Sequence, residues 1–234
     1  MDRGMISIKT KQLFDEYKIG EDVILTYQIQ YPHFEGPVYQ MALRILNRFY
    51  ENQANEFQNY IANELYPQAK EQYAYSKENG YPVIAYEAMT TFEPTYSKAC
   101  IVSLYMDRYE FTGGAHGSTT RSSQTWNLQG GRQIALEELF GCDLDVQSYI
   151  LNRVRSRIAL NPQIYFDNAA QLAEENFHPE SFYCTTQGIV VYYQQYDIAP
   201  YSSGIRSFLI PYTHCVHSPK TTCFVLHPQD ERHP

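Results

Sequence analysis

Apolar and polar side chains alternate along two stretches near the N-terminus, residues 5–14 and 21–31. A period of two residues is typical of strands that bury one face, so both stretches are predicted to be β-strands. The Tyr31–Pro32 step is expected to end the second strand, because proline cannot donate a ladder hydrogen bond.

A helical period follows from Val38 onwards. Apolar residues recur there at steps of three and four, which predicts an amphipathic helix. Pro67 is expected to kink or restart this helix, because its ring removes a backbone hydrogen bond and clashes with the preceding turn. Helix then continues to about Lys77 and stops at Asn79–Gly80. The apolar face consists of Met41, Ala42, Ile45, Leu46, Phe49, Phe57, Ile61 and Leu65.

The rest of the chain is predicted to be mostly strands, with shorter helices between them. Residues 82–92 and 97–111 are expected to pair across a connection at Glu93–Pro94. Further strands are expected at 119–128, 181–185, 188–196 and 205–212, and helical segments at 135–140, 145–159 and 167–176. Strands and helices do not alternate regularly. The pattern therefore predicts an α+β fold: a mainly antiparallel sheet with helices packed on one face, and two sub-lobes sharing a core.

Length and composition narrow the class of protein. A chain of 234 residues fits one large domain or two small lobes. Hydrophobic residues make up 44%, which excludes wholesale disorder. The sequence contains no run of about 18 apolar residues, so no membrane span is predicted. The net charge of −8, without a Lys/Arg cluster, argues against nucleic-acid binding. Composition leaves the oligomeric state open.

The cysteines and the N-terminus bear on the compartment. The five cysteines are odd in number, widely spaced and without a Cys-x-x-Cys pair, which favours reduced and mostly buried thiols. The first 14 residues lack the apolar core of a secretory signal. Both features predict a cytoplasmic protein, or an extracytoplasmic one if the chain is a trimmed form of a longer protein. The cysteines are Cys100, Cys142, Cys184, Cys215 and Cys223.

A glycine-rich stretch at residues 112–117 is the first candidate for chemistry. Gly113 and Gly114 permit positive φ, so the backbone can turn tightly and present His116 from a loop. A functional histidine needs an acidic partner and a nucleophile or metal, and no standard catalytic motif supplies them. We therefore favour a structural His116 that hydrogen-bonds within its hairpin, and assign no catalytic residue. A hydrolase using His116 with Asp197 or a nearby glutamate is the alternative.

Tyrosine is over-represented, with 22 residues, and is densest between residues 192 and 201. Its ring and hydroxyl suit a half-buried strand, and they equally suit a recognition surface. Asp197, at a strand end beside Tyr196 and Tyr201, is a candidate for binding a sugar or peptide. Such an aspartate more often holds its own loop through backbone amides.

The C-terminal segment from residue 214 carries metal-ligand residue types. Their spacing fits no standard zinc module, and the segment is polar and proline-rich. We favour a flexible tail over 214–234 and predict neither a metal site nor a cofactor. The residues concerned are His214, Cys215, His217, Cys223, His227 and His233.

Several motifs resemble a known pair of bacterial domains. Residues 109–116 (YEFTGGAH), 126–128 (WNL), 136–140 (LEELF) and 188–204, followed by 210–212 (IPY), resemble the RsiV-like C-terminal domain of unknown function. Upstream, Tyr31–Pro32 and the helix with Leu46–Asn47 resemble the N-terminal partner domain of PdaC-type peptidoglycan deacetylases. The two halves together cover roughly residues 8–212.

The resemblance implies an N-terminal lobe over 5–111 and a C-terminal lobe over 112–213. In RsiV-type proteins the pair is an extracellular sensor that binds lysozyme. Deacetylase activity belongs to a separate module and is not carried over. The resemblance thus implies a non-enzymatic binding module for lysozyme or a cell-wall glycan, acting through loops 112–122 and 196–204. The alternative is a cytoplasmic protein that keeps the fold without the ligand. The expected binding residues are Gly113, Gly114, His116, Tyr196, Asp197 and Tyr201.

Overall fold

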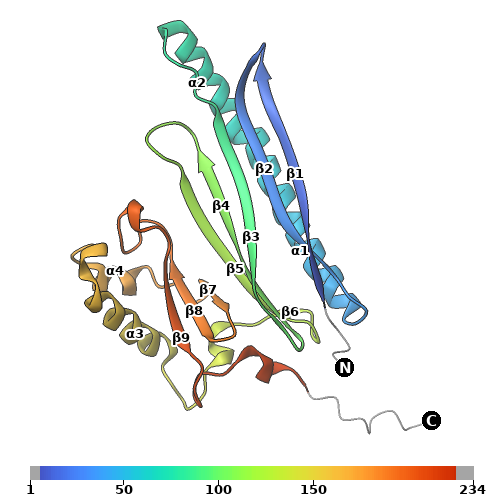
Figure 1. The fold of residues 1–234 in the computed structure, drawn as a ribbon, viewed down its shortest axis with the longest axis vertical. Coiled ribbons are helices and arrows are strands. Elements are labelled where there is room, and N and C mark those ends of the chain that lie inside the picture. The colour runs from blue at the N-terminus through green and yellow to red at the C-terminus, as the bar shows by residue number, and fades with distance from the viewer. Residues whose placement is uncertain (1–5, 225–234) are drawn as a thin grey trace.

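The computed structural model describes residues 6–224 and contains two β-sheets (Figure 1). The larger sheet has the strand order β1-β2-β3-β4-β5-β6, and the smaller has the order β7-β8-β9. The strands of the larger sheet are β1 Ser7–Ile19, β2 Asp22–Glu35, β3 Tyr86–Lys98, β4 Ile101–Phe111, β5 Ser118–Asn127 and β6 Arg132–Gln133. Those of the smaller sheet are β7 Phe182–Cys184, β8 Gly188–Tyr193 and β9 Arg206–Pro211.

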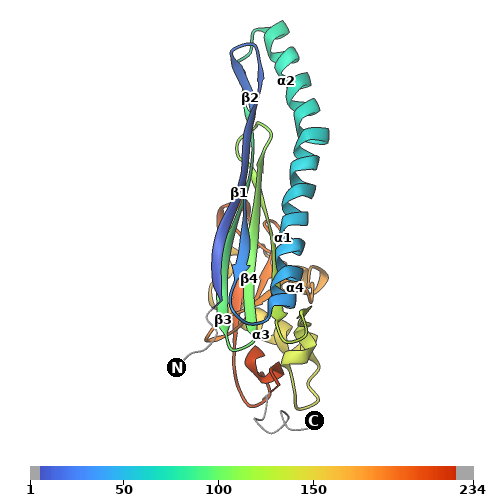
Figure 2. The same ribbon diagram turned by 90° about the vertical axis from the view of Figure 1, so that its right-hand side faces the viewer.

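The longest helical segment lies along one face of the larger sheet (Figure 2). It comprises α1 Gln40–Tyr60, a π-helical turn Ile61–Leu65 and α2 Tyr66–Asn79. The smaller lobe contributes α3 Val146–Leu160 and α4 Ala169–Glu175, with 3-10 turns at Leu136–Leu139, Pro162–Ile164, Tyr201–Ser203 and Pro219–Thr222. All strand pairs are antiparallel except β2 and β3, which run parallel over Leu25–Ile29. The predicted α+β fold is confirmed.

Pro67 is accommodated without a break in the helix. The preceding turn is π-helical, and the Tyr66 N–H donates to the Ile61 carbonyl, five residues back. This wider turn absorbs the backbone mismatch that a proline creates in a regular α-helix. The helix ends where predicted, at Gly80, whose φ of 70° is the left-handed conformation of a helix C-cap.

Two expected strand ends are wrong. β2 continues through Pro32, because the missing N–H lies on the edge facing away from β1, beyond the part paired with β3. The Phe34 N–H, two residues on along the same edge, donates to the Asn47 side chain at 2.7 Å. β3 continues through Pro94, next to a register shift, and the hairpin turn falls later, where Ala99 has a φ of 55°.

The second lobe packs on the face of β4 and β5 opposite α1. Along β4, Leu104 and Met106 join the core beneath the helix, whereas Ser103 and Tyr105 face the smaller sheet. The Ser103 hydroxyl accepts a hydrogen bond from the Cys184 N–H at 2.9 Å. Buried residues therefore form two main clusters, and Tyr39 packs against both.

Residues 112–117 form the hairpin turn between β4 and β5, two neighbouring strands of the larger sheet. β5 pairs with β4 from Ser118 to Asn127, so this sheet continues well past residue 112. The transition to the smaller lobe follows β6, after Gln133. Within residues 6–224, no helix combines the length and the apolar character needed to cross a bilayer.

The expectation of reduced cysteines is wrong, because the structure contains two disulfides. Cys100 bonds to Cys223, and Cys142 bonds to Cys215, at sequence separations of 123 and 73 residues. Partners so far apart leave no local sequence signature. Cys184 alone is free, and burial raises the pKa of its thiol to about 12.

The two disulfides also alter the expectation of a flexible tail from residue 214. Residues 213–224, here called the C-terminal strap, are held by both bonds and by a β-bridge between Val216 and Phe140. The strap joins the β3–β4 turn of the larger sheet to the smaller lobe. His227 and His233 lie outside the described residues.

Candidate functional site

The β4–β5 hairpin loop presents His116 as predicted. Gly113 and Gly114 have φ values of 92° and 94°, and a Cβ on either would meet no atom within 4 Å. Glycine is therefore favoured at both positions by the positive φ, and not by lack of space for a side chain. A Cβ on Gly117 would lie 2.5 Å from the ring of Tyr109, so close packing fixes the other end of this loop.

A second loop, residues 194–204, is held on the outer edge of β5 by two glutamine side chains. The Arg121 N–H donates to Gln194 Oε1 at 2.8 Å, and Gln194 Nε2 donates back to the Arg121 carbonyl at 2.7 Å. The Thr119 N–H donates to Gln195 Oε1 at 2.7 Å. These side chains take the place of a neighbouring strand and bring the loop beside the hairpin tip.

The two loops together form an exposed group of rings, which we call the aromatic cluster: His116, Tyr196 and Tyr201. The imidazole of His116 stacks on the ring of Tyr201, with centroids 3.6 Å apart and planes 12° apart. The Tyr196 hydroxyl lies 3.4 Å from His116 Nε2, and the Tyr196 side chain is 54% exposed. His116 Nδ1 pairs with the Gly117 carbonyl at 3.0 Å, in line with the predicted hairpin role.

Asp197 holds its own loop and does not pair with His116. Its Oδ2 accepts from the Gln194 N–H at 2.7 Å, and its carbonyl accepts from Asn176 Nδ2 at 2.9 Å. Burial raises the pKa of the Asp197 carboxyl, with the Gln194 hydrogen bond acting in the opposite direction. Among the described residues no carboxylate is hydrogen-bonded or ion-paired to His116, so the proposed hydrolytic pair is not formed.

An ion pair between Arg121 of β5 and Asp107 of β4 lies next to the loops and was not predicted. Arg121 Nε and Nη2 donate to the two oxygens of Asp107 at 2.7 and 2.6 Å, and the Arg121 side chain is only 13% exposed. Its guanidinium lies 3.7 Å from the centroid of the Tyr105 ring. The pairing depends on the β4–β5 register, which places Asp107 opposite Arg121 and which sequence alone does not reveal.

A groove between α1 and strands β3–β5 was also missed. It has a volume of about 470 Å³ and a floor that includes Phe57 and Met106. Arg108 occupies one side, with its guanidinium 3.9 Å from the Phe57 ring centroid and 4.5 Å from that of Tyr60. Arg108 Nε also donates to Glu110 Oε1 at 2.6 Å, so its charge is already compensated.

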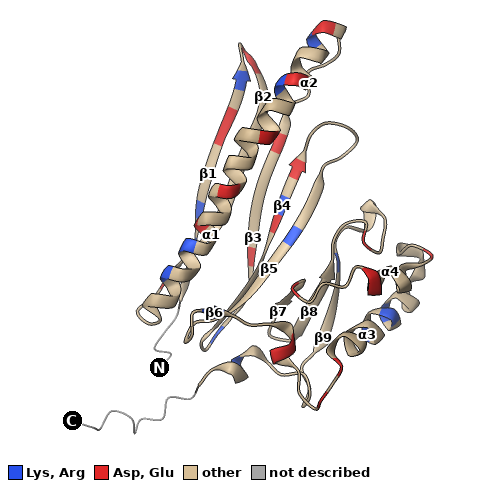
Figure 3. Ribbon diagram, turned by 180° about the vertical axis from the view of Figure 1, so that it is seen from behind, with Lys and Arg blue, Asp and Glu red and all other residues tan. Residues whose placement is uncertain are grey.

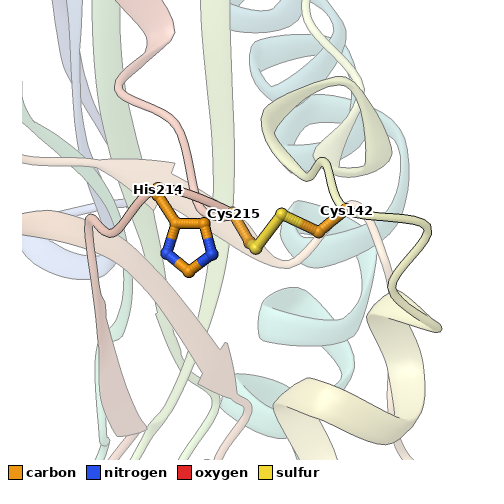
Figure 4. A group of neighbouring side chains, drawn as sticks. All are labelled: Cys142, His214 and Cys215. Atoms are coloured by element: carbon orange, nitrogen blue, oxygen red, sulfur yellow. A yellow bond between two sulfur atoms is a disulfide. The ribbon is translucent and has the colours of Figure 1, made fainter.

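One group of side chains has donor atoms of metal-binding type. Ligand atoms of Cys142, His214 and Cys215 all lie within 4.8 Å of one another (Figure 4). The two sulfurs are joined in a disulfide. In this oxidised form neither cysteine offers a thiolate to a metal ion.

Comparison with known proteins assigns both halves of the chain. Residues 20–119 match the family model described as deacetylase PdaC. Residues 137–213 match the family model described as protein of unknown function (DUF3298). The chain therefore has a PdaC-type N-terminal region followed by a DUF3298 C-terminal region. This confirms the two-part resemblance inferred from its motifs.

Solved structures share this architecture. A DUF3298 family member from Bacteroides fragilis NCTC 9343 superposes with a TM-score of 0.73 at 18% identity, covering 94% of this chain and 97% of the other. A DUF3298 family protein from Pseudomonas aeruginosa PAO1 gives 0.56 at 18% identity, covering 88% and 91%. At this identity the likeness shows the fold alone. No curated protein matches the chain.

Proposed function

We propose that this chain is a non-enzymatic recognition module that binds a protein of the lysozyme class through the aromatic cluster. The observation that carries the proposal is the meeting of two loops, about 80 residues apart in sequence, in one surface group of three rings, of which those of His116 and Tyr201 stack. Aromatic side chains held in fixed positions give contact area at low entropic cost.

The support beneath the cluster favours binding without rearrangement. Gln194 and Gln195 fix one loop to β5, and the half-buried Arg121–Asp107 ion pair joins that strand to β4. A surface prepared in this way loses little conformational freedom when a partner docks.

Charge supports a basic partner. The chain has a net charge of −8, and acidic positions recur, with basic ones among them, along α1, α2 and the strands beside them (Figure 3). A basic protein such as lysozyme is attracted to such a surface, and this attraction speeds encounter and weakens with salt.

The absence of a suitable partner for His116 supports a non-enzymatic role. In the described part of the chain both of its ring nitrogens face neutral groups, the Gly117 carbonyl and the Tyr196 hydroxyl. A general base of the usual kind has an acidic group that orients the imidazole.

The two disulfides support an oxidising location outside the cytoplasm. Disulfides persist in such compartments and are rare where thiols are kept reduced. Of the two locations that the sequence left open, we therefore propose the extracytoplasmic one.

Calorimetry with hen-type lysozyme tests the proposal at low and at moderate salt. We expect binding at both, and at least tenfold weaker binding after Tyr196→Ala, as for an aromatic anchor. Tyr75→Ala is the matched control, because Tyr75 is 55% exposed on α2, away from the cluster. Binding that vanishes at moderate salt, or that both variants weaken equally, would contradict the proposal.

A cell-wall glycan is the second candidate, because sugars also pack against exposed tyrosine rings. Co-sedimentation with insoluble peptidoglycan, using the same two variants, tests it. Retention that depends on Tyr196 would show that the aromatic cluster binds glycan. No binding in either assay would leave a protein that keeps the fold without the ligand.

A further inference from the structure

We infer that Cys142, His214 and Cys215 form a binding site for a thiophilic divalent ion such as Zn²⁺ once their disulfide is reduced. The site lies in the smaller lobe, where the C-terminal strap meets the segment after the 3-10 turn Leu136–Leu139. It is independent of the aromatic cluster and of the function proposed for it.

The donor set fits a zinc ion. Two thiolates and one imidazole are ligands that Zn²⁺ prefers, and three protein donors leave a fourth tetrahedral position for water. Bonds of roughly 2.0–2.3 Å place tetrahedral donors about 3.3–3.8 Å apart. A ring nitrogen of His214 lies within 4.8 Å of both sulfurs, which the disulfide now joins, so a small movement suffices once the sulfur–sulfur bond is broken.

The backbone keeps the two cysteines together without the disulfide. The Gly141 N–H donates to the Cys215 carbonyl at 2.9 Å, and the His217 N–H donates to the Leu139 carbonyl at 2.7 Å. A β-bridge between Phe140 and Val216 lies in the same pair of segments. Reduction therefore leaves two thiols that remain neighbours, which lowers the entropic cost of chelation.

His214 is positioned by contacts that do not use its ring. His217 Nε2 pairs with the His214 carbonyl at 2.8 Å, which fixes the backbone at this position. The His214 imidazole lies beside the disulfide with no hydrogen bond to another described residue (Figure 4). Both ring nitrogens are thus available to a metal ion.

Access distinguishes this disulfide from the other one. Cys142 and His214 are exposed, whereas Cys100 of the second disulfide is 1% exposed. A small dithiol reductant reaches the Cys142–Cys215 bond, donates two electrons and two protons, and leaves as its own disulfide. Each thiol then releases its proton to solvent when its sulfur binds the ion.

The test uses the full chain, oxidised or treated with a dithiol and desalted without oxygen. Alkylation and mass spectrometry identify the reduced cysteines, and dialysis against Zn²⁺ with elemental analysis gives the bound metal. We expect about one zinc per reduced chain, less than a tenth of that in the oxidised chain, and protection of Cys142 and Cys215 from alkylation by zinc.

Variants separate this site from adventitious binding. His214→Ala should weaken zinc binding by the reduced chain at least tenfold, whereas His178→Ala, at an exposed histidine next to Glu180, should not. The double variant Cys142→Ser/Cys215→Ser should bind no zinc in either state, and its circular dichroism reports whether the fold survives loss of this bond. Equal zinc binding by the oxidised and reduced chains, none by the reduced chain, or binding unaffected by His214→Ala would overturn the inference.

Discussion

At the scale of single residues, Tyr50 shows how one hydroxyl joins the helix to the sheet. Its side chain is fully buried, accepts from Trp126 Nε1 at 3.0 Å and donates to Gln124 Oε1 at 3.2 Å. Burial raises the pKa of Tyr50 well above its ordinary value, so it stays neutral.

Tyr50→Phe should lower the free energy of unfolding by about 1–3 kcal/mol, because it leaves a buried indole N–H without an acceptor. Urea denaturation measures the change. Tyr75→Phe, at an exposed tyrosine, should change stability by less than about 0.5 kcal/mol. Equal effects of the two substitutions would mean that the buried hydroxyl is not a significant contact.

Asp197 gives a prediction about pH. Burial raises the pKa of this carboxyl in the folded state, so on acidification the folded chain takes up its proton before the unfolded chain does. Its contribution to stability is therefore most favourable at low pH and is lost as pH rises through the folded-state pKa.

Asp197→Asn removes this titration and keeps an oxygen that accepts from the Gln194 N–H. The variant should be more stable than wild type at pH 7, and the gap should narrow towards about pH 4, where aspartate normally titrates. Urea midpoints of both proteins at the two pH values check this. A gap that widens on acidification would reverse the assigned sign.

At the scale of elements, the π-helical turn before Pro67 leads to a paired prediction. Because the turn already absorbs the proline, Pro67→Ala should destabilise the protein by only about 0.4–1 kcal/mol, through the greater freedom of the unfolded chain. Gln68→Pro, one residue on in α2, should cost about 3 kcal/mol or more. Thermal unfolding compares the two; a clear gain in stability from Pro67→Ala would show that the native turn is strained.

Hydrophobic periodicity predicted most elements but misplaced those that contain proline. The helix from α1 to α2 and the strand β5 lie close to their expected ranges. The ends of β2 and β3 were predicted wrongly, because a proline ends a strand only where its N–H would have to donate to a neighbouring strand. Pro32 and Pro94 lie where the larger sheet does not require that bond. Which neighbouring strand a residue's N–H faces depends on the strand order of the sheet, and a single sequence does not reveal that order.

At the scale of the whole molecule, the Cys100–Cys223 disulfide ties the end of the described chain to the β3–β4 turn. Replacing both cysteines with serine should lower the free energy of unfolding by about 2–5 kcal/mol, because the bond closes a loop of 123 residues in the unfolded state. Chemical denaturation of the double variant measures the loss. A change below about 1 kcal/mol would show that the hydrogen bonds of Asn127 to Thr222 already hold the strap.

The candidate site was predicted in part. The glycines and tyrosines of the two loops are local signals, and His116, Tyr196 and Tyr201 indeed meet. The Arg121–Asp107 pair, the groove beside α1 and both disulfides join residues that are distant in sequence or matched only by register. Those features required the three-dimensional arrangement.

The long span of the Cys100–Cys223 bond also bears on how the chain is made. Of the five cysteines, Cys223 leaves the ribosome last, so Cys100 stays without its partner while the next 123 residues are synthesised. Pairing in order of emergence would join Cys100 to Cys142 and Cys184 to Cys215. The native pattern follows neither of these pairings and leaves Cys184 free and buried in β7. Correct oxidation therefore depends on tertiary structure, and a disulfide isomerase should raise the yield of refolded protein.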